Sequence, residues 1–132
     1  MLTTIVIAVA GGLSTFALSL VPFIGAIRAS TLATLVAYPV FWVVFDSSTA
    51  NAFGALFFGG SFVGMSSSAK LSWLGVTLAA SVFGVLSAVI LPLLNGMGGA
   101  LGVCAFLSVV IVYLSGMLYR KYNPRTINRN EL

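Results

Sequence analysis

Charge is nearly absent from most of this sequence. The first 119 positions hold only three charged residues, Arg28, Asp46 and Lys70, and 6% of the whole chain is charged, against about 25% in soluble domains. A chain of 132 residues has too little interior to hide its 60% of hydrophobic residues from water. These two facts exclude a soluble fold and predict that lipid surrounds most of the chain.

Histidine and paired cysteines are also missing, and each absence excludes a kind of site. Without histidine the chain lacks the usual metal ligand and the usual general base at neutral pH. The single cysteine, Cys104, has no partner for a disulfide. Asp46 is the only acid before residue 120, so no second carboxylate lies near it in the sequence. We therefore expect no catalytic residues, no metal site and no cofactor, and we do not expect an enzyme.

Long apolar runs are what the sequence has in abundance. A spanning helix needs about 20 apolar residues, because each residue adds about 1.5 Å against a hydrocarbon core about 30 Å thick. The runs predict five transmembrane helices, at residues 2–27, 30–45, 51–65, 71–94 and 100–119. The predicted fold is thus an all-α, polytopic integral membrane helix bundle. It comprises a transmembrane helical domain at 1–119 and a basic, flexible cytoplasmic tail at 120–132.

Two details of this prediction concern individual spans. The first run contains Gly11, Gly12 and Pro22, which predict a kink near its inner end. The second and third runs are short for a bilayer, so four or three spans with a re-entrant segment in residues 30–65 remain an alternative. We favour five spans because backbone at membrane depth must form its hydrogen bonds internally, which helices do most simply.

Positive charge predicts one orientation for the chain. Lys and Arg prefer the cytoplasmic side of a membrane. With the N-terminus outside, Arg28, Lys70 and the basic tail all fall in the cytoplasm, and Asp46 falls outside. The net charge of +4 comes mostly from the tail, so we expect it to meet anionic lipid headgroups and not nucleic acid. Compactness and short loops favour the bacterial inner membrane.

The segment from Phe57 to Lys70 is the most unusual in the chain, because it is dense in glycine and serine. A broken helix there would present backbone groups, hydroxyls and one cation to a polar solute, and would suit an anion or a headgroup better than a metal cation. Asp46 and Asn51 would join such a site if they lie within the membrane. The candidate binding or pathway residues are Gly59, Gly60, Ser61, Gly64, Ser66, Ser67, Ser68, Lys70, Asp46 and Asn51.

Small residues have a second interpretation, as faces for helix packing. Small residues four apart let helix backbones approach closely in lipid. The candidate packing residues are Gly60, Gly64, Ala80, Gly84, Ala88, Gly98 and Gly102. In the same conservative interpretation, Asp46 is a solvated residue of the headgroup region and Asn51 is a cap or turn residue.

Two functions remain open on this sequence. One chain of five short helices has little room for a ligand cavity, so we expect a homo-oligomer or an association with other membrane subunits. The first hypothesis is a channel or transporter component for a small solute, with residues 59–70 lining the path. The alternative is a non-catalytic structural or accessory subunit of a larger membrane complex, in which the glycines serve only as packing faces. The sequence identifies no substrate.

Overall fold

The computed structural model describes residues 1–66, 70–90, 92–93 and 99–123, and these ranges contain five α-helices. The helices are α1 (Leu2–Ser19), α2 (Gly25–Val44), α3 (Ser47–Gly64), α4 (Trp73–Ile90) and α5 (Ala100–Tyr122). No strand occurs in the described ranges. The predicted all-α fold is therefore confirmed.

Four of these helices, α1, α2, α4 and α5, are long and apolar enough to cross a membrane. The chain is thus an integral membrane protein, as its composition predicts. The remaining helix, α3, has 18 residues, but its glycines, serines and Asn51 lower its hydropathy.

The first helix is shorter than the predicted first span. It continues without a break through Gly11 and Gly12 and ends at Ser19, and a turn at residues 20–24 takes the place of the predicted kink. Pro22 lies in this turn, where its ring interrupts no helical hydrogen bond. Phe23 has a φ of 79°, and the Arg28 Nη1 donates to the Phe23 carbonyl oxygen over 3.3 Å, which supports this unusual backbone.

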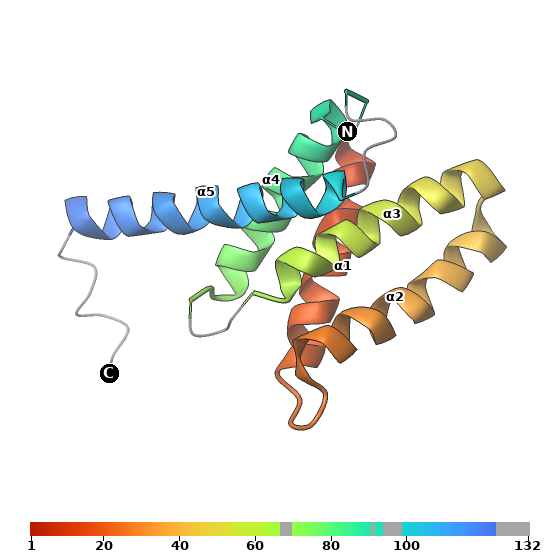
Figure 1. Ribbon diagram of the computed structural model, residues 1–132, viewed down its shortest axis with the longest axis horizontal. Coiled ribbons are helices and arrows are strands. Elements are labelled where there is room, and N and C mark those ends of the chain that lie inside the picture. The colour runs from red at the N-terminus through yellow and green to blue at the C-terminus, as the bar shows by residue number, and fades with distance from the viewer. Residues whose placement is uncertain (67–69, 91, 94–98, 124–132) are drawn as a thin grey trace.

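Helix α3 lies at the centre of the fold and contacts each of the other four helices. Figure 1 shows α2 and α3 side by side as an antiparallel pair, with α1 crossing behind α3. Helix α5 contacts α3 and α4 near its beginning and then extends away from the other helices (Figure 1). The least apolar helix is therefore the one that other helices cover most.

The core consists mainly of small residues with a few aromatic rings between them. One buried cluster joins α1, α3, α4 and α5 around the fully buried Val76 and Phe83. A second cluster joins α1, α2 and α3 around Leu56 and Phe57. Because lipid is as apolar as this core, the helices associate through close packing and not through exclusion of water.

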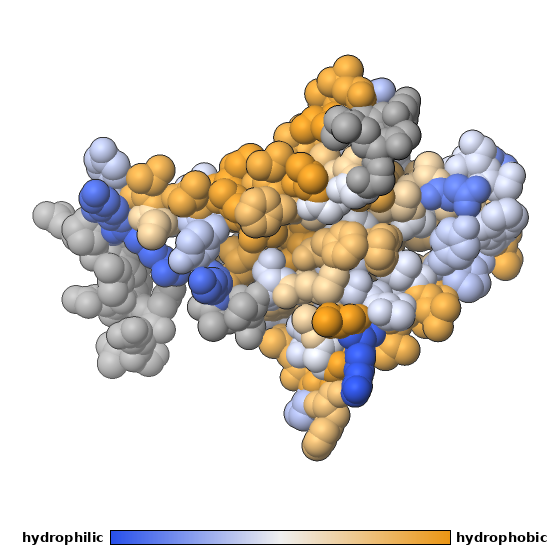
Figure 2. Space-filling view, in the orientation of Figure 1, coloured by the Kyte–Doolittle hydropathy of each residue, from blue (hydrophilic) through white to orange (hydrophobic). Residues whose placement is uncertain are grey.

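The outer surface is dominated by apolar side chains. On the face shown in Figure 2, hydrophobic surface covers much of the molecule, and the strongly hydrophilic surface lies toward its periphery. Large exposed side chains include Leu35 on α2, Leu74 on α4 and Leu118 on α5. Such a surface is stable in contact with lipid and would aggregate in water.

Candidate functional site

The first part of the glycine- and serine-rich segment lies inside a regular helix. Gly59, Gly60, Ser61 and Gly64 are all buried residues of α3, and α3 continues unbroken to Gly64. A Cβ added to Gly60 would overlap the carbonyl oxygen of Ala8 and would lie 2.9 Å from its Cα. The backbones of α1 and α3 are therefore in direct contact at this point.

The contact between α1 and α3 continues one turn further along both helices. A Cβ added to Gly64 would overlap the carbonyl oxygen of Gly12 and lie 2.9 Å from the Thr15 Cβ. In the same way, a Cβ at Gly11 would overlap the Phe57 carbonyl oxygen. Small residues on both helices thus let the two backbones meet, with no room for a solute between them.

Gly59 faces a different neighbour, the ring of Phe83 on α4. A Cβ added to Gly59 would overlap the Phe83 Cζ, and Phe83 itself is completely buried. This ring fills the space between α3 and α4. The glycine-rich part of the candidate pathway is consequently closed on the side that faces the core.

Ser61 takes part in a hydrogen-bond chain between α2 and α3. The Ser61 Oγ lies 2.6 Å from the Phe58 carbonyl oxygen and 2.7 Å from the Ser30 Oγ. A carbonyl oxygen can only accept, so the single Ser61 proton goes to Phe58 and the Ser30 hydroxyl donates to Ser61. Both serines are buried, and the chain satisfies both hydroxyl donors.

Two buried threonine hydroxyls have no hydrogen-bond partner among the residues that the structure describes. They belong to Thr15 on α1 and Thr34 on α2. Thr15 is fully buried, and Ser14 occupies the Gly11 carbonyl oxygen that Thr15 would normally use. A buried hydroxyl without a partner costs about 1–3 kcal/mol.

Asp46 lies between α2 and α3, where it caps α3. Its Oδ2 accepts a hydrogen bond from the Thr49 backbone N–H over 3.1 Å. This satisfies one of the N–H groups that the first turn leaves free. The hydrogen bonds from Thr49 lower the pKa of the Asp46 carboxyl below its ordinary value. The carboxylate is fully exposed, and its role in this structure is to cap helix α3.

Asn51 lies in the second turn of α3 and not at the end of a span. Its Oδ1 accepts a hydrogen bond from the Tyr38 hydroxyl of α2 over 2.7 Å, and both side chains are exposed. Asp46 and Asn51 therefore form one polar group at the N-terminal end of α3. An 18-residue helix is about 27 Å long, so this group lies far from the end near Gly64.

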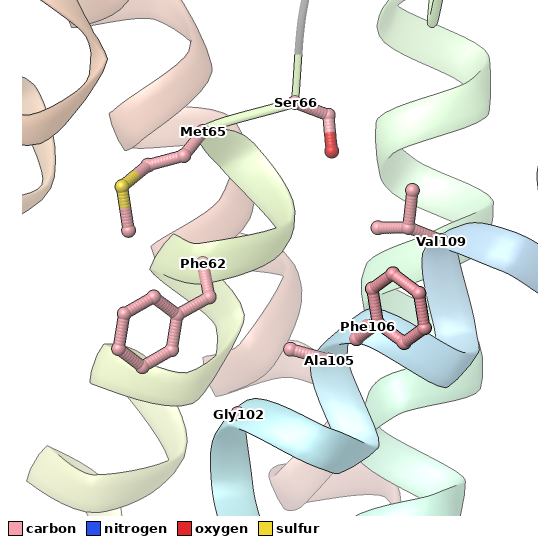
Figure 3. A pocket seen from close by; sticks show the side chains of 7 residues that line it. All are labelled: Phe62, Met65, Ser66, Gly102, Ala105, Phe106 and Val109. Atoms are coloured by element: carbon pink, nitrogen blue, oxygen red, sulfur yellow. The ribbon is translucent and has the colours of Figure 1, made fainter.

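Ser66 and Lys70 lie beyond the opposite end of α3. The Lys70 Nζ is 5.8 Å from the centre of the Tyr113 ring on α5, which is within the range of a cation–π contact. Ser66 borders a groove of about 290 Å³ between α3 and α5. Figure 3 shows the Ser66 hydroxyl directed toward this groove, with Phe62 and Met65 on one side and Phe106 on the other.

One face of α3 remains partly open to the outside. Asn51 and Phe58 are exposed, Phe62 is half-buried, and Ser66 follows the helix end on the same side. Phe58, Phe62 and Ser66 follow Asn51 by 7, 11 and 15 positions, and this spacing places residues on one face of a helix. The rings of Phe58 and Phe62 pack edge to face with centres 4.6 Å apart. This outer α3 face joins the two polar ends of the helix across an aromatic middle.

The candidate packing residues outside α3 lie in different surroundings. A Cβ added to Gly84 would lie 2.8 Å from the Ile5 Cα, and the Ala80 Cβ lies 3.2 Å from a Cβ added to Gly12. Ala88 is half-buried, and Gly102 has nothing within 4 Å of an added Cβ. Ser67, Ser68 and Gly98 lie outside the described residues.

Sequence reasoning missed the partners of α3. Gly11 and Gly12 lie in the contact with α3, although the sequence suggested only a kink, and a pair of glycines inside an apolar run is a signal for close helix contact. Ser30 and Tyr38 gave no signal of their own, because single hydroxyls are common in membrane helices.

Comparison with known proteins gives no relative for this chain. No family model, no curated protein and no solved structure matches it. The geometry described above is therefore the sole basis for the function proposed below.

Proposed function

We propose that this protein is a component of an oligomeric channel or transporter for a small solute. The observation that carries the proposal is the outer α3 face. Helix α3 is the one helix of the described chain that falls short of the hydropathy of a membrane span, yet Asn51 and Phe58 on this face remain exposed. The polar side chain of Asn51 would be costly against hydrocarbon and suits the wall of a path.

An oligomer follows from the packing of α3. Its buried side is closed against α1 at Gly60 and Gly64 and against α4 at Gly59. A path through the described part of the chain therefore has no room behind α3 and would run along the outer α3 face. A second copy of the chain or another membrane subunit would have to complete the wall.

The solute class follows from the side chains on this face. Asn51 and Ser66 are uncharged, and Phe58 and Phe62 form an apolar middle. A wall with these groups favours a neutral or weakly polar solute over a metal cation, because it offers no carboxylate in the middle. Asp46 would lie at the entrance, and its charge would remain in water.

The proposed placement in the membrane follows from the charges. The N-terminus would be outside and the C-terminus cytoplasmic, in a bacterial inner membrane, because Arg28, Lys70 and the tail then share the cytoplasmic side. Arg120 and Lys121 lie in the last turn of α5, where they would meet anionic lipid headgroups. We do not propose an enzyme activity, a cofactor or a nucleic-acid partner.

Liposomes that contain only this chain provide the test. Liposomes shrink when glycerol is added outside, and their reswelling as glycerol enters, followed by light scattering, should be faster than in liposomes without the protein. Phe58→Ala should raise the rate because it widens the middle of the path, and Asn51→Leu should lower it because it removes the polar group at the entrance. Leu74→Ala, at an exposed position of α4, serves as the matched control and should leave the rate unchanged. A substitution at Gly60 is unsuitable, since it would push α1 and α3 apart.

Either of two results would contradict the proposal. If no neutral solute passes faster than in empty liposomes, or if Leu74→Ala changes the rate as much as Phe58→Ala, transport along the outer α3 face is wrong.

The second candidate is a structural or accessory subunit of a larger membrane complex. The tight contacts of Gly59, Gly60 and Gly64 favour it, because in the described chain these glycines serve helix packing. Gentle extraction from native membranes separates the two functions. A stoichiometric partner that copurifies would support the accessory role, and a homo-oligomer alone would support the transport role.

A further inference from the structure

The groove between α3 and α5 is apolar along its walls and polar at one end. Phe62 and Met65 form the α3 wall, and Phe106 and Val109 form the α5 wall (Figure 3). The Ser66 hydroxyl lies at one end. The groove has a volume of about 290 Å³ and is open at the side, so hydrocarbon can enter it from the membrane.

A cation lies just beyond the polar end of this groove. Tyr113 follows Val109 by one turn on the same face of α5, and the Lys70 Nζ is 5.8 Å from the centre of its ring. Lys70 also follows Ser66 by four positions in the chain. One end of the groove therefore carries a hydroxyl with a positive charge near it, and the other lining side chains are apolar.

The floor of the groove is formed by Gly102 and Ala105 of α5. A Cβ added to Gly102 meets nothing within 4 Å. By contrast, a Cβ at any described glycine within α1, α3 or α4 would lie at most 3.2 Å from another atom. Glycine in a helix interior costs about 0.5–1 kcal/mol relative to alanine, so Gly102 keeps a space open at that cost, and no described residue fills it.

We propose that the groove between α3 and α5 binds one anionic phospholipid. An acyl chain lies along Phe62, Phe106 and Gly102, and the phosphate lies near Lys70 and the Ser66 hydroxyl. The apolar walls and open side of the groove suit an acyl chain, and the cation near its polar end suits a phosphate. The inference goes beyond the proposed transport and does not depend on it, although Phe62 and Ser66 belong to both surfaces, so a bound lipid would form part of the wall of the path.

Charge distinguishes a lipid from a second copy of this chain as the occupant. Within residues 1–123, the only acid that a second copy could offer to Lys70 is Asp46, which caps the opposite end of α3. A two-fold pairing through this groove would also bring a second Lys70 into the neighbourhood of the first. An anionic headgroup supplies the missing negative charge directly.

Native mass spectrometry of the whole chain in detergent tests the proposal. The probes are phosphatidylglycerol and phosphatidylcholine with identical acyl chains. The unmodified chain should retain one lipid and prefer phosphatidylglycerol. Lys70→Gln should lower the affinity for phosphatidylglycerol about fivefold and leave that for phosphatidylcholine unchanged. Arg28→Gln, which removes a cation at the start of α2 and outside the groove, should leave the preference intact.

A pair of glycine variants tests the groove itself. Gly102→Leu should abolish retention of both lipids, because Gly102 lines the groove and its added Cβ meets no described atom within 4 Å, so the larger side chain would occupy the groove. Gly116→Leu is the matched control: it lies on the same helix, is equally open and is outside the groove, so retention should not change. Circular dichroism should show equal helix content in both variants.

Two results would overturn the proposal. In the first, Lys70→Gln leaves the ratio of the two lipid affinities unchanged. In the second, the unmodified chain forms a dimer that Gly102→Leu dissociates while lipid retention stays the same, which would assign the groove to contact between copies.

Discussion

Gly60 of α3 lies so close to the carbonyl oxygen of Ala8 on α1 that no side chain fits between the two backbones. The same contact recurs one turn later, where Gly64 meets the Gly12 carbonyl oxygen. In a protein whose exterior is as apolar as its interior, such contacts replace exclusion of water as the source of association. The fold should therefore respond strongly to a single methyl group at these positions.

Gly60→Ala and Gly64→Ala should each destabilise the protein by about 1–3 kcal/mol, because the added methyl group forces α1 and α3 apart. Unfolding by denaturant in detergent micelles measures this. Gly116→Ala is the control, since its Cβ meets nothing and alanine favours a helix by up to about 1 kcal/mol. Equal effects at Gly60 and Gly116 would contradict the close contact.

Ser30 and Ser61 should show coupled effects on stability, because the Ser30 hydroxyl donates to Ser61 across α2 and α3. A double-mutant cycle with Ser30→Ala and Ser61→Ala should give a coupling of about 0.6–1.7 kcal/mol, the range for hydrogen bonds between membrane helices. Ser61→Ala should cost more than Ser30→Ala, because it leaves a buried donor without its acceptor. Additive effects in the cycle would show that the two hydroxyls do not interact.

Asp46 should make the stability of α3 depend on pH. Its hydrogen bonds with Thr49 lower the carboxyl pKa in the folded protein. The stabilisation is therefore present above the pKa of the unfolded chain and is lost as pH falls through the lower pKa of the folded chain. Asp46→Asn keeps a capping side chain but has no charge to titrate, so its stability should change less over the same acidic range. Thermal unfolding in micelles, followed by circular dichroism at several pH values, makes the comparison; parallel curves for both proteins would refute the capping role.

Labelling in sealed vesicles should locate the ends of the helices. In a Cys104→Ala background, Ser72→Cys beside Lys70 and Tyr122→Cys at the end of α5 should react with an impermeant maleimide from one face. Ser48→Cys, at the start of α3, should react from the opposite face if all five helices cross. Failure of Ser48→Cys to react from the opposite face would favour a re-entrant pair of α2 and α3. Reaction of Ser72→Cys and Tyr122→Cys from different faces would overturn the single-sided placement of the cations.

The sequence by itself determined that lipid surrounds this protein and that its fold is all-α. Both follow from composition, because sparse charge and long apolar runs leave α-helices in lipid as the simplest way to satisfy the backbone. Helix ends were less predictable. Hydropathy does not change at Ser19, so only the local backbone at Pro22 and Phe23 separates α1 from α2.

The tertiary structure alone decided what each small or polar residue touches. Gly60 and Gly102 have the same chemistry and similar sequence surroundings, but one lies against the Ala8 carbonyl and the other opens into a groove. Asp46 and Lys70 belong to one candidate set in the sequence and lie toward opposite ends of α3 in space. The reason is geometric: an apolar helix is compatible with many rotations about its axis, and only contact with its neighbours selects the one that is occupied.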